Sequence, residues 1–340
     1  MNQQSFPPGK LPHGILSRFI RDYTDQDPRL IVPPALGEDA AVIDFGDRYL
    51  VAKTDPITFA TDAIGWYAVN VNANDIAAMG ATPRFFMATL LLPEGQAKPA
   101  QVESIFRSIH EAATQLHIAV CGGHTEITHG IDRPIVVGQM LGEVAPAALV
   151  RSSGLCPGDR LILTKGLAIE ATAIIAREKR EELLQKRFTP DFLDRCAAYL
   201  ENPGISVVKD ARIATRAGRV TAMHDPTEGG VATGLFELAT ASDVGLEVPI
   251  SALSVSPESA RLCAAFDLDP LGVISSGALL LGCAAGDARR IIAALEEANI
   301  SAAIIGTVHP SDFGLQLEHD GHHMPLPTFA TDEITRIFQE

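Results

Sequence analysis

The strongest constraint in this sequence is one apolar stretch, residues 64–79, that carries a dense set of polar side chains. Its hydrophobic residues recur at helical spacing, which predicts a helix. Four of the six positions from 70 to 75 are amides or acids, namely Asn70, Asn72, Asn74 and Asp75. Residues three or four apart share a helix face, so these groups line two neighbouring faces. Such groups cost free energy in an apolar helix unless they find partners, so the stretch predicts a polar site.

Two further acidic turns lie in the same half of the chain. Gly37-Glu38-Asp39-Ala40-Ala41 precedes a predicted strand, and Lys53-Thr54-Asp55 ends the next one. Each turn alone is well explained as a turn aspartate or a helix cap. Hard oxygen ligands brought together suit Mg²⁺, which commonly takes one or two carboxylates together with substrate phosphates. The three segments together favour a magnesium site over three unrelated turns.

Composition sets the class of protein. The chain has 340 residues, 46 % apolar and 20 % charged, which is enough for a packed core and two domains. No apolar run reaches the ~20 residues of a membrane helix, and we expect no signal peptide and no membrane association. A net charge of −15 without a Lys/Arg cluster argues against nucleic-acid binding. Five scattered cysteines without a CxxC predict reduced thiols and a cytoplasmic protein.

The order of elements predicts two α/β or α+β domains, one over residues 1–150 and one over residues 151–340. Alternating apolar residues predict strands at 39–53, 84–92, 133–143, 160–164, 277–283 and 302–308. Helical spacing predicts helices at 64–79, 99–115, 168–186, 190–200, 206–217, 230–240 and 286–298. Residues 147–159 read as a linker between the halves. The polar tail from Gly314 is expected to be peripheral.

A glycine pair marks a second candidate region. The apolar run 118–121 leads into Gly122-Gly123-His124-Thr125-Glu126, which predicts a strand ending in a Gly-Gly turn. Glycines let backbone N–H groups come close to a phosphate, although Gly-Gly is also an ordinary turn. The sequence contains neither a P-loop nor a GxGxxG dinucleotide motif.

A third candidate region follows the predicted strand at 219–223. It reads His224-Asp225-Pro226-Thr227-Glu228-Gly229-Gly230-Val231, with charged residues leading into glycines at a predicted helix start. Helix N-termini are natural anion sites. His224 is a candidate general base or acid, and Asp225 a candidate for orienting a substrate. A hydrogen-bonded structural histidine explains His224 about equally well.

Seven motifs, taken in order, resemble the aminoimidazole ribonucleotide synthetase superfamily. They are GEDAAV (37–42), KTDPITFAT (53–61), NVNANDIAAMGA (70–81), GGHTE (122–126), RSSGLCPGD (151–159), DPTEGGV (225–231) and SSGALL (275–280). The superfamily includes that purine enzyme, thiamine-phosphate kinase, selenophosphate synthetase and the hydrogenase maturation factor HypE. The central block, with KTDPITFAT before it, looks most like the HypE subgroup.

The resemblance implies a two-domain fold whose N-terminal domain forms a β-barrel across a homodimer. It implies ATP, with Mg²⁺ held by the matching acids Asp39, Asp55 and Asp75. It implies that Gly122, Gly123, His124 and Thr125 contact the nucleotide phosphates. Lys53, Asn72 and Asn74 would belong to the same nucleotide site. The shared chemistry is phosphorylation of a carbonyl or amide oxygen. In HypE-like proteins that amide is a thiocarboxamide on the protein's own C-terminal cysteine.

Three departures from the HypE pattern bear on the reaction. The sequence ends Asp332-Glu-Ile-Thr-Arg-Ile-Phe-Gln-Glu340, without the terminal Pro-Arg-X-Cys. GGHTE stands where Gly-Asp-Thr is common, so Glu126 is the candidate to replace the missing acid. Glu228 stands where HypE-like proteins commonly carry arginine, so the second substrate is expected to differ.

Three functions follow as alternatives. The first is an ATP-dependent enzyme that phosphorylates an oxygen of an unidentified small molecule or protein-borne amide, with His224, Asp225 and Glu228 as candidate catalytic residues. The second is a non-catalytic dimer derived from HypE that binds nucleotide or a maturation partner. The third is an aminoimidazole ribonucleotide synthetase, which the HypE-like central motifs disfavour.

Overall fold

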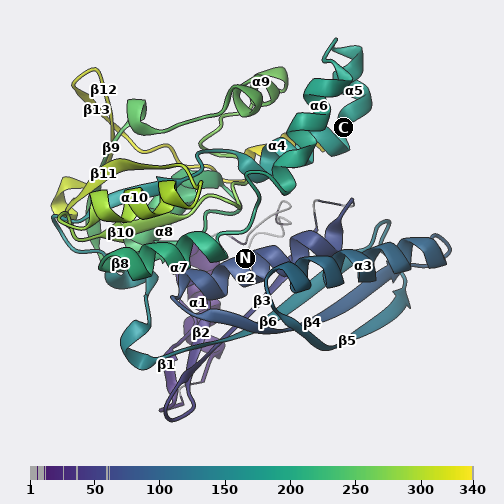
Figure 1. Cartoon of the computed structure of the whole chain (residues 1–340), viewed down its shortest axis with the longest axis horizontal. Helices are drawn as coiled ribbons and strands as arrows, with labels where there is room; N and C mark the ends of the chain where they lie inside the picture. The colour runs from purple at the N-terminus through teal and green to yellow at the C-terminus, as the bar shows by residue number, and fades with distance from the viewer. Residues whose placement is uncertain are drawn as a thin grey trace. The chain divides into compact units, whose positions relative to one another are not determined.

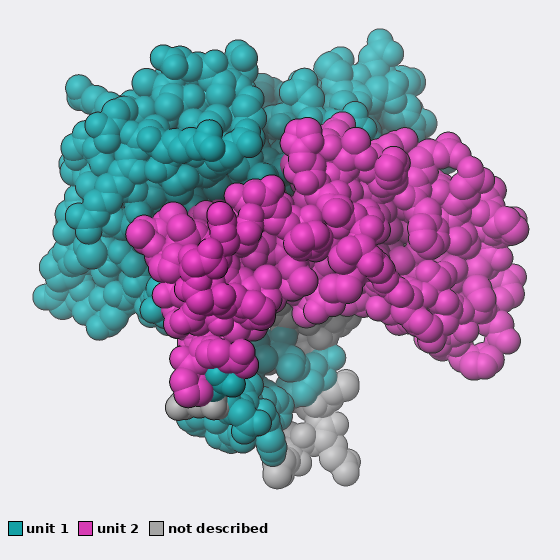
Figure 2. Space-filling model, turned by 60° about the horizontal axis from the view of Figure 1, so that its bottom comes forward, with its two compact units in different colours: residues 1–27, 34–38, 150–340 teal, residues 28–33, 39–149 magenta. Residues whose placement is uncertain are grey.

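The computed structural model describes Phe6, Leu11, Ala60 and residues 13–25, 27–35, 37–58 and 62–338. The chain forms two compact units, coloured separately in Figure 2. The smaller unit comprises residues 28–33 and 39–149, and the larger comprises residues 1–27, 34–38 and 150–340. The smaller unit ends at Leu149, and the chain from Val150 onward belongs to the larger unit. The amino-terminal residues before Asp39, apart from residues 28–33, group with the larger unit.

The smaller unit is a six-stranded sheet with two helices on one face (Figure 1). The strands lie in the order β1-β2-β3-β6-β4-β5, and all pairs are antiparallel except β4 with β5. Their bounds are β1 Leu30–Val32, β2 Ala41–Asp44, β3 Tyr49–Ile57, β4 Thr82–Pro93, β5 Ala119–Thr128 and β6 Ile135–Val144. The helices are α2 Ile64–Ala78 and α3 Pro99–Gln115. The predicted strands at 84–92 and 133–143 and both helices are confirmed, and the run 39–53 is two strands, β2 and β3.

Helix α2 is the core of this unit. All of its fifteen residues except Trp66 are buried, and it packs against α3 and the strands β3, β6 and β4. Two of its polar side chains bond back to the helix itself: the Asn70 side chain donates to Trp66 O, and the Asn72 side chain donates to Ala68 O. Gly138 on β6 makes room for Asn72, because a Cβ at that position would overlap the Asn72 amide. Gly142 on the same strand likewise makes room for Ile76, so glycines allow the helix to pack closely on β6.

The larger unit is built on a seven-stranded sheet in the order β13-β12-β9-β11-β7-β10-β8, in which only β12 and β9 pair in parallel. The strands are β7 Arg160–Thr164, β8 Val220–His224, β9 Val244–Pro249, β10 Leu280–Cys283, β11 Ala302–Pro310, β12 Leu315–His319 and β13 His322–Pro325. The α-helices are α1 His13–Tyr23, α4 Ile169–Glu178, α5 Arg180–Gln185, α6 Pro190–Ala197, α7 Val208–Ala217, α8 Gly230–Ser242, α9 Pro257–Ala265 and α10 Ala288–Glu297. Six 3₁₀ helices complete the described elements: η1 Pro146–Ala148 in the smaller unit, and η2 Ser152–Gly154, η3 Ala198–Leu200, η4 Ile250–Ala252, η5 Ser311–Phe313 and η6 Glu333–Ile337 in the larger.

Two expectations about the chain's organisation are wrong. The tail from Gly314 is not peripheral: β12 and β13 extend the sheet, and Ile334 and Ile337 are buried. Gly122 and Gly123 do not form a turn, because both lie inside β5. Gly123 has a φ of 152°, and a Cβ there would overlap the backbone of Ala88 on β4, so glycine is needed for strand pairing. Among the described residues, no helix is long and apolar enough to cross a membrane.

Candidate functional site

In the smaller unit, an ion-pair cluster joins β3 to α2. Lys53 Nζ lies 3.2 Å from Asp75 Oδ1 and 3.3 Å from Asp55 Oδ2. The Asp75 side chain is only 5 % exposed, whereas that of Asp55 is 32 % exposed. Lys53 and Asp55 lie two residues apart on one strand, so their side chains share a face of the sheet. The structure thus brings together three of the residues that the family resemblance assigns to the nucleotide and metal site.

Asn72 fixes the spacing between strand and helix. Its Oδ1 accepts a hydrogen bond of 2.9 Å from the Asp55 backbone N–H, and its Nδ2 lies 3.3 Å from Asp55 O. A side-chain amide thus pairs with a backbone amide as a second strand would. This pairing ties the backbone at Asp55 to α2, the helix that carries Asp75.

The carboxylates of Asp39 and Asp75 are neighbours. Each offers an oxygen, and these oxygens lie within 4.8 Å of one another, with both residues buried. All candidate donors in this unit are oxygens of carboxylates and amides, the ligand type that Mg²⁺ prefers. Asp39 and Asp75 therefore offer ligands of the type that suits Mg²⁺, whereas Asp55 does not belong to this close group of carboxylates. Asn74, the fourth polar residue of α2, is fully buried.

The glycine-containing motif lies elsewhere in the same unit. Gly122, Gly123, His124, Thr125 and Glu126 belong to β5, which is exposed along nearly its whole length. Strands β6 and β4 separate β5 from β3. Three strand spacings amount to about 14 Å. Within one copy of the unit, the motif and the Asp55 carboxylate are therefore too far apart to contact the same phosphate group.

Two side chains of β5 contact each other. His124 Nε2 lies 3.1 Å from Glu126 Oε2, and both side chains are well exposed. The predicted cradle of backbone N–H groups at a Gly-Gly turn is absent from the described residues, because these positions are in an extended strand.

The larger unit contains a second polar group, at the end of β8. His224 and Asp225 are buried, and His224 Nε2 lies 3.0 Å from Glu237 Oε2 on α8. A histidine held by a carboxylate fits a general base and a structural pair equally. Glu237 is a residue that the sequence reasoning missed. Its position as a buried glutamate in an apolar helix is the signal that would have identified it.

Two further buried acids, also missed, lie near Glu228. Burial raises the pKa of Glu170 to about 7, with added repulsion from Asp332 and Glu228. Burial likewise raises the pKa of Asp332 to about 7, opposed by backbone hydrogen bonds from Ile334 and Gly229. Glu170 interrupts the apolar start of α4, the same kind of signal as the asparagines of α2. Nothing in the tail sequence marks Asp332.

Two family models match the chain and together cover most of it. AIR synthase related protein, N-terminal domain, matches residues 37–144, and AIR synthase related protein, C-terminal domain, matches residues 156–318. The fold and the acidic set on β3 and α2 thus lie within a defined class of two-domain α/β proteins. The chain belongs to the AIR synthase-related family.

Within that family, the chain is similar to hydrogenase maturation proteins. Carbamoyl dehydratase HypE of Rhizobium leguminosarum bv. viciae is 30 % identical over 273 residues, which are 78 % of this chain and 73 % of the relative. A hydrogenase expression/formation protein of Methanocaldococcus jannaschii is 28 % identical over 288 residues, 83 % of this chain and 82 % of the relative. The crystal structure of E. coli HypE matches with a TM-score of 0.74 at 25 % identity, covering 95 % of this chain and 98 % of that one.

Proposed function

We propose that this protein is an ATP-dependent enzyme of the HypE type that phosphorylates an amide or carbonyl oxygen of an external acceptor. The observation that carries the proposal is the Lys53, Asp55 and Asp75 cluster, which Asn72 holds in place. Mg²⁺ bound to Asp39, Asp55 and Asp75 would screen the triphosphate charge during phosphoryl transfer. Phosphorylation would turn the amide oxygen into a leaving group, and loss of that oxygen fits the name of the relative, carbamoyl dehydratase.

The nucleotide assignment has support from the fold. A HypE solved in complex with ATP shares the fold, with a TM-score of 0.72 at 24 % identity. In this chain, Lys53 contacts Asp55 and Asp75 and would meet the phosphates. Asn72 and Asn74 would support that set from α2. Lys165 is less suitable, because it is buried against Asp210, and burial lowers its pKa.

Three of the five cysteines are unsuited to carry the acceptor group, whereas Cys121 and Cys156 are exposed. Cys283, the last cysteine in the sequence, is buried in β10, and burial raises the pKa of its thiol to about 12. Cys196 and Cys263 are buried with similarly raised pKa values of about 12. Such thiols are neither ionised nor accessible at neutral pH, so they are poor carriers of a carbamoyl group. A small amide or a thiol on a partner protein is the acceptor that we propose.

A homodimer would give the β5 motif a place in the nucleotide site. The free edge of β5 pairs with no strand of the described residues, and it exposes Val120 and Ile127. Edges of this kind pair readily with a second copy. We propose a barrel across two copies in which the motif Gly122–Glu126 faces nucleotide phosphates.

We also propose a maturation protein as a partner. A HypE with this fold was solved in a HypE–HypF complex.

Turnover of Mg-ATP tests the proposal. We expect ADP and phosphate release that rises when an acceptor is supplied, measured with a panel of small carboxamides, thiocarboxamide peptides and formylglycinamidine ribonucleotide. Calorimetric titration with a non-hydrolysable ATP analogue measures binding in parallel. Stimulation by the ribonucleotide alone would identify an aminoimidazole ribonucleotide synthetase instead. Absence of both binding and turnover would reject the nucleotide site.

A second candidate is a nucleotide-binding assembly protein without turnover. The departures in GGHTE and at Glu228 favour it, since both change charges in motifs that HypE-like proteins use. Tight nucleotide binding with no turnover in the presence of every acceptor and of a hydrogenase maturation partner would support this alternative. His224, Asp225 and Glu228 would then serve binding or folding rather than catalysis.

A further inference from the structure

A proposed metal ligand lies directly beside a crossing of the chain between the two compact units. Asp39 begins the long segment of the smaller unit, residues 39–149, whereas the residues before it, 34–38, belong to the larger unit. One peptide bond therefore joins the proposed ligand to Glu38 in the larger unit. The chain crosses back just before the motif RSSGLCPGD (151–159), which the proposed reaction does not use.

The start of that motif, the turn η2, is fixed within the larger unit. Ser152 Oγ donates a hydrogen bond to Met223 O on β8 at 3.3 Å, and Ser242 Oγ on α8 donates to Ser152 O at 3.1 Å. A Cβ at Gly154 would overlap a backbone oxygen of β8, so the turn lies directly against that strand. The turn thus has fixed contacts to one strand and one helix of the larger unit.

Glu38 is anchored on this turn. Ser153 Oγ donates a hydrogen bond of 2.9 Å to Glu38 Oε1, and Arg151 Nη2 lies 3.7 Å from the same oxygen. The Arg151 side chain is 46 % exposed, so its ion pair contributes little. The Glu38 side chain is only 7 % exposed, and loss of the serine donor would leave its oxygen short of a partner away from water. The Ser153 hydrogen bond is therefore the stronger anchor.

Gly37 packs the same segment against α8. Its φ of 79° lies in the left-handed region that favours glycine. A Cβ at this position would come within 2.9 Å of Glu237 O and 3.3 Å of Ala241 Cβ, so only glycine allows this approach. The two residues before Asp39 are therefore both held by the larger unit.

We propose that Glu38 is a positioning residue: its hydrogen bond with Ser153 fixes the backbone at Asp39 and thereby sets how tightly Asp39 holds a divalent cation. This inference rests on the proposed function, in which Asp39 is a Mg²⁺ ligand. Glu38 acts through the backbone, because among the described residues it does not belong to the close group of carboxylates that includes Asp39 and Asp75. A ligand whose backbone is fixed beforehand loses less conformational entropy on binding.

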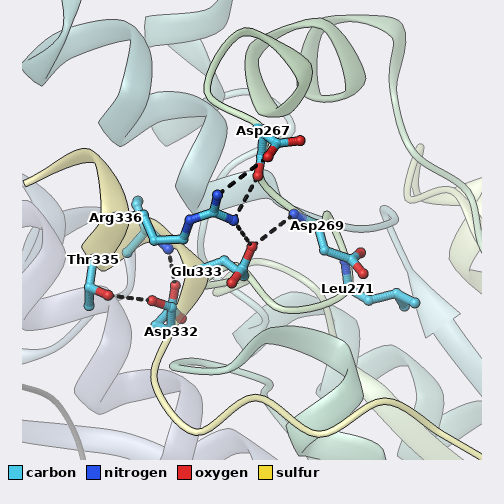
Figure 3. A network of polar contacts seen from close by, with 8 residues as sticks. Asp267, Asp269, Leu271, Asp332, Glu333, Thr335 and Arg336 are labelled. Carbon is cyan, nitrogen blue, oxygen red and sulfur yellow. Dashed lines mark hydrogen bonds and ion pairs between the residues drawn. The ribbon is translucent and has the colours of Figure 1, made fainter.

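The tail of the chain offers a matched control. Glu333 lies 2.8 Å from Arg336 and accepts a hydrogen bond from the Asp269 N–H at 3.3 Å (Figure 3). Like Glu38, it is a glutamate of the larger unit that is held by an arginine and by a hydrogen-bond donor. It holds the tail rather than the segment before Asp39. Glu333→Gln therefore controls for the loss of one such carboxylate.

Hydrogen exchange of the full chain without metal or nucleotide tests the anchor itself. Glu38→Gln and Ser153→Ala break the contact from its two sides. We expect the backbone amides of residues 37–42 to exchange about fivefold faster in both variants, and at the wild-type rate in Glu333→Gln. This readout does not depend on the proposed function. Unchanged exchange in both variants would overturn the proposal.

A Mg²⁺ titration separates a positioning residue from a ligand. Calorimetric binding of a non-hydrolysable ATP analogue at a series of Mg²⁺ concentrations gives the Mg²⁺ midpoint. We expect Glu38→Gln and Ser153→Ala each to raise this midpoint about fivefold, with full binding restored at saturating Mg²⁺. The double variant should shift the midpoint no further, because both substitutions break one contact. Shifts that add in free energy would show that Glu38 acts by itself, and would overturn the positioning role.

The remaining outcomes are equally distinct. A variant that is merely destabilised would bind less analogue at every Mg²⁺ concentration with an unchanged midpoint, and that result would also overturn the proposal. Wild-type protein without Mg²⁺-dependent binding would reject the proposed function itself. Normal binding by the wild type, with unshifted midpoints in both folded variants, would reject only the role of Glu38. Thermal melting confirms that each variant is folded.

Discussion

The ammonium of Lys53 lies 3.2 Å from the buried carboxylate of Asp75. A carboxylate that is only 5 % exposed needs a positive partner, because an isolated buried charge is expensive. Lys53 fulfils that need in the protein without metal. A divalent cation at Asp75 would compete with Lys53 for the same oxygen, or release its ammonium toward the phosphates of a nucleotide. The cluster is thus suited to change partners when Mg-ATP binds.

The Asp75→Asn substitution tests the metal assignment. It keeps the size of the side chain but removes a charged oxygen ligand, so we expect Mg-ATP affinity or turnover to fall at least about tenfold. Calorimetry with Mg-ATP, and with ATP in the presence of a chelator, measures nucleotide affinity with and without the metal ion. Asp132→Asn, at an exposed position of the same unit, is the control. Full affinity and turnover in the Asp75 variant would refute the metal site.

Lys53→Met separates stability from ligand binding. The variant keeps an unbranched apolar stem but leaves Asp55 and Asp75 without their cation. We expect the ligand-free variant to be less stable by about 1–3 kcal/mol. Added Mg²⁺ should stabilise it more than it stabilises the wild type, because the carboxylates are then free to hold the ion. Melting curves with and without Mg²⁺ measure both effects, with Lys98→Met on the surface as control. A variant that melts at the same temperature as the wild type would mean that the ion pair contributes nothing to the stability of the protein.

The sequence predicts well those parts of the site that depend on spacing within one helix or one strand. The polar residues of α2 are three or four apart on a helix whose apolar residues specify its burial, so their clustering follows from helical geometry. Lys53 and Asp55 share a face of one strand for the same reason. Which of these residues share a face can be predicted without knowledge of the rest of the fold.

The parts that sequence could not predict depend on tertiary pairing. Gly122-Gly123 favours a turn by local propensity, yet here β4 approaches so closely that only glycine fits at position 123. Phe106 belongs to the apolar stripe of α3 but is 52 % exposed. The partners His224 and Glu237 lie thirteen positions apart, on different elements. Asp332 is buried only because it caps the start of α8, more than a hundred residues away.

A charge on the free edge of β5 tests the proposed dimer. We expect the wild type to have the mass of a homodimer by light scattering at micromolar concentration. Ile127 is 57 % exposed on this strand, and Ile127→Arg should shift the mass to that of a monomer, because like charges would meet across a paired edge. Met324→Arg, on an exposed strand of the larger unit, is the control. A monomeric wild type, or a dimeric Ile127 variant, would reject pairing through β5.

The buried acids Glu170 and Asp332 predict how stability depends on pH. Both have pKa values of about 7 in the folded protein, above their ordinary values of 4.5 and 3.8. Between those values the folded state binds more protons than the unfolded state, so the free energy of unfolding decreases as pH rises. We therefore expect stability to fall from about pH 4.5 to about pH 7 and then to level off.

Glu170→Gln isolates one of these contributions. Glutamine cannot ionise, so the variant should lose part of the decrease between pH 5 and pH 8. Relative to the wild type, its free energy of unfolding should rise by an amount on the order of 1–3 kcal/mol across that range. Urea unfolding at a series of pH values measures the difference, and Glu297→Gln at the surface gives the baseline. The direction is the decisive result, because a purely structural defect in the variant would lower its stability by the same amount at every pH.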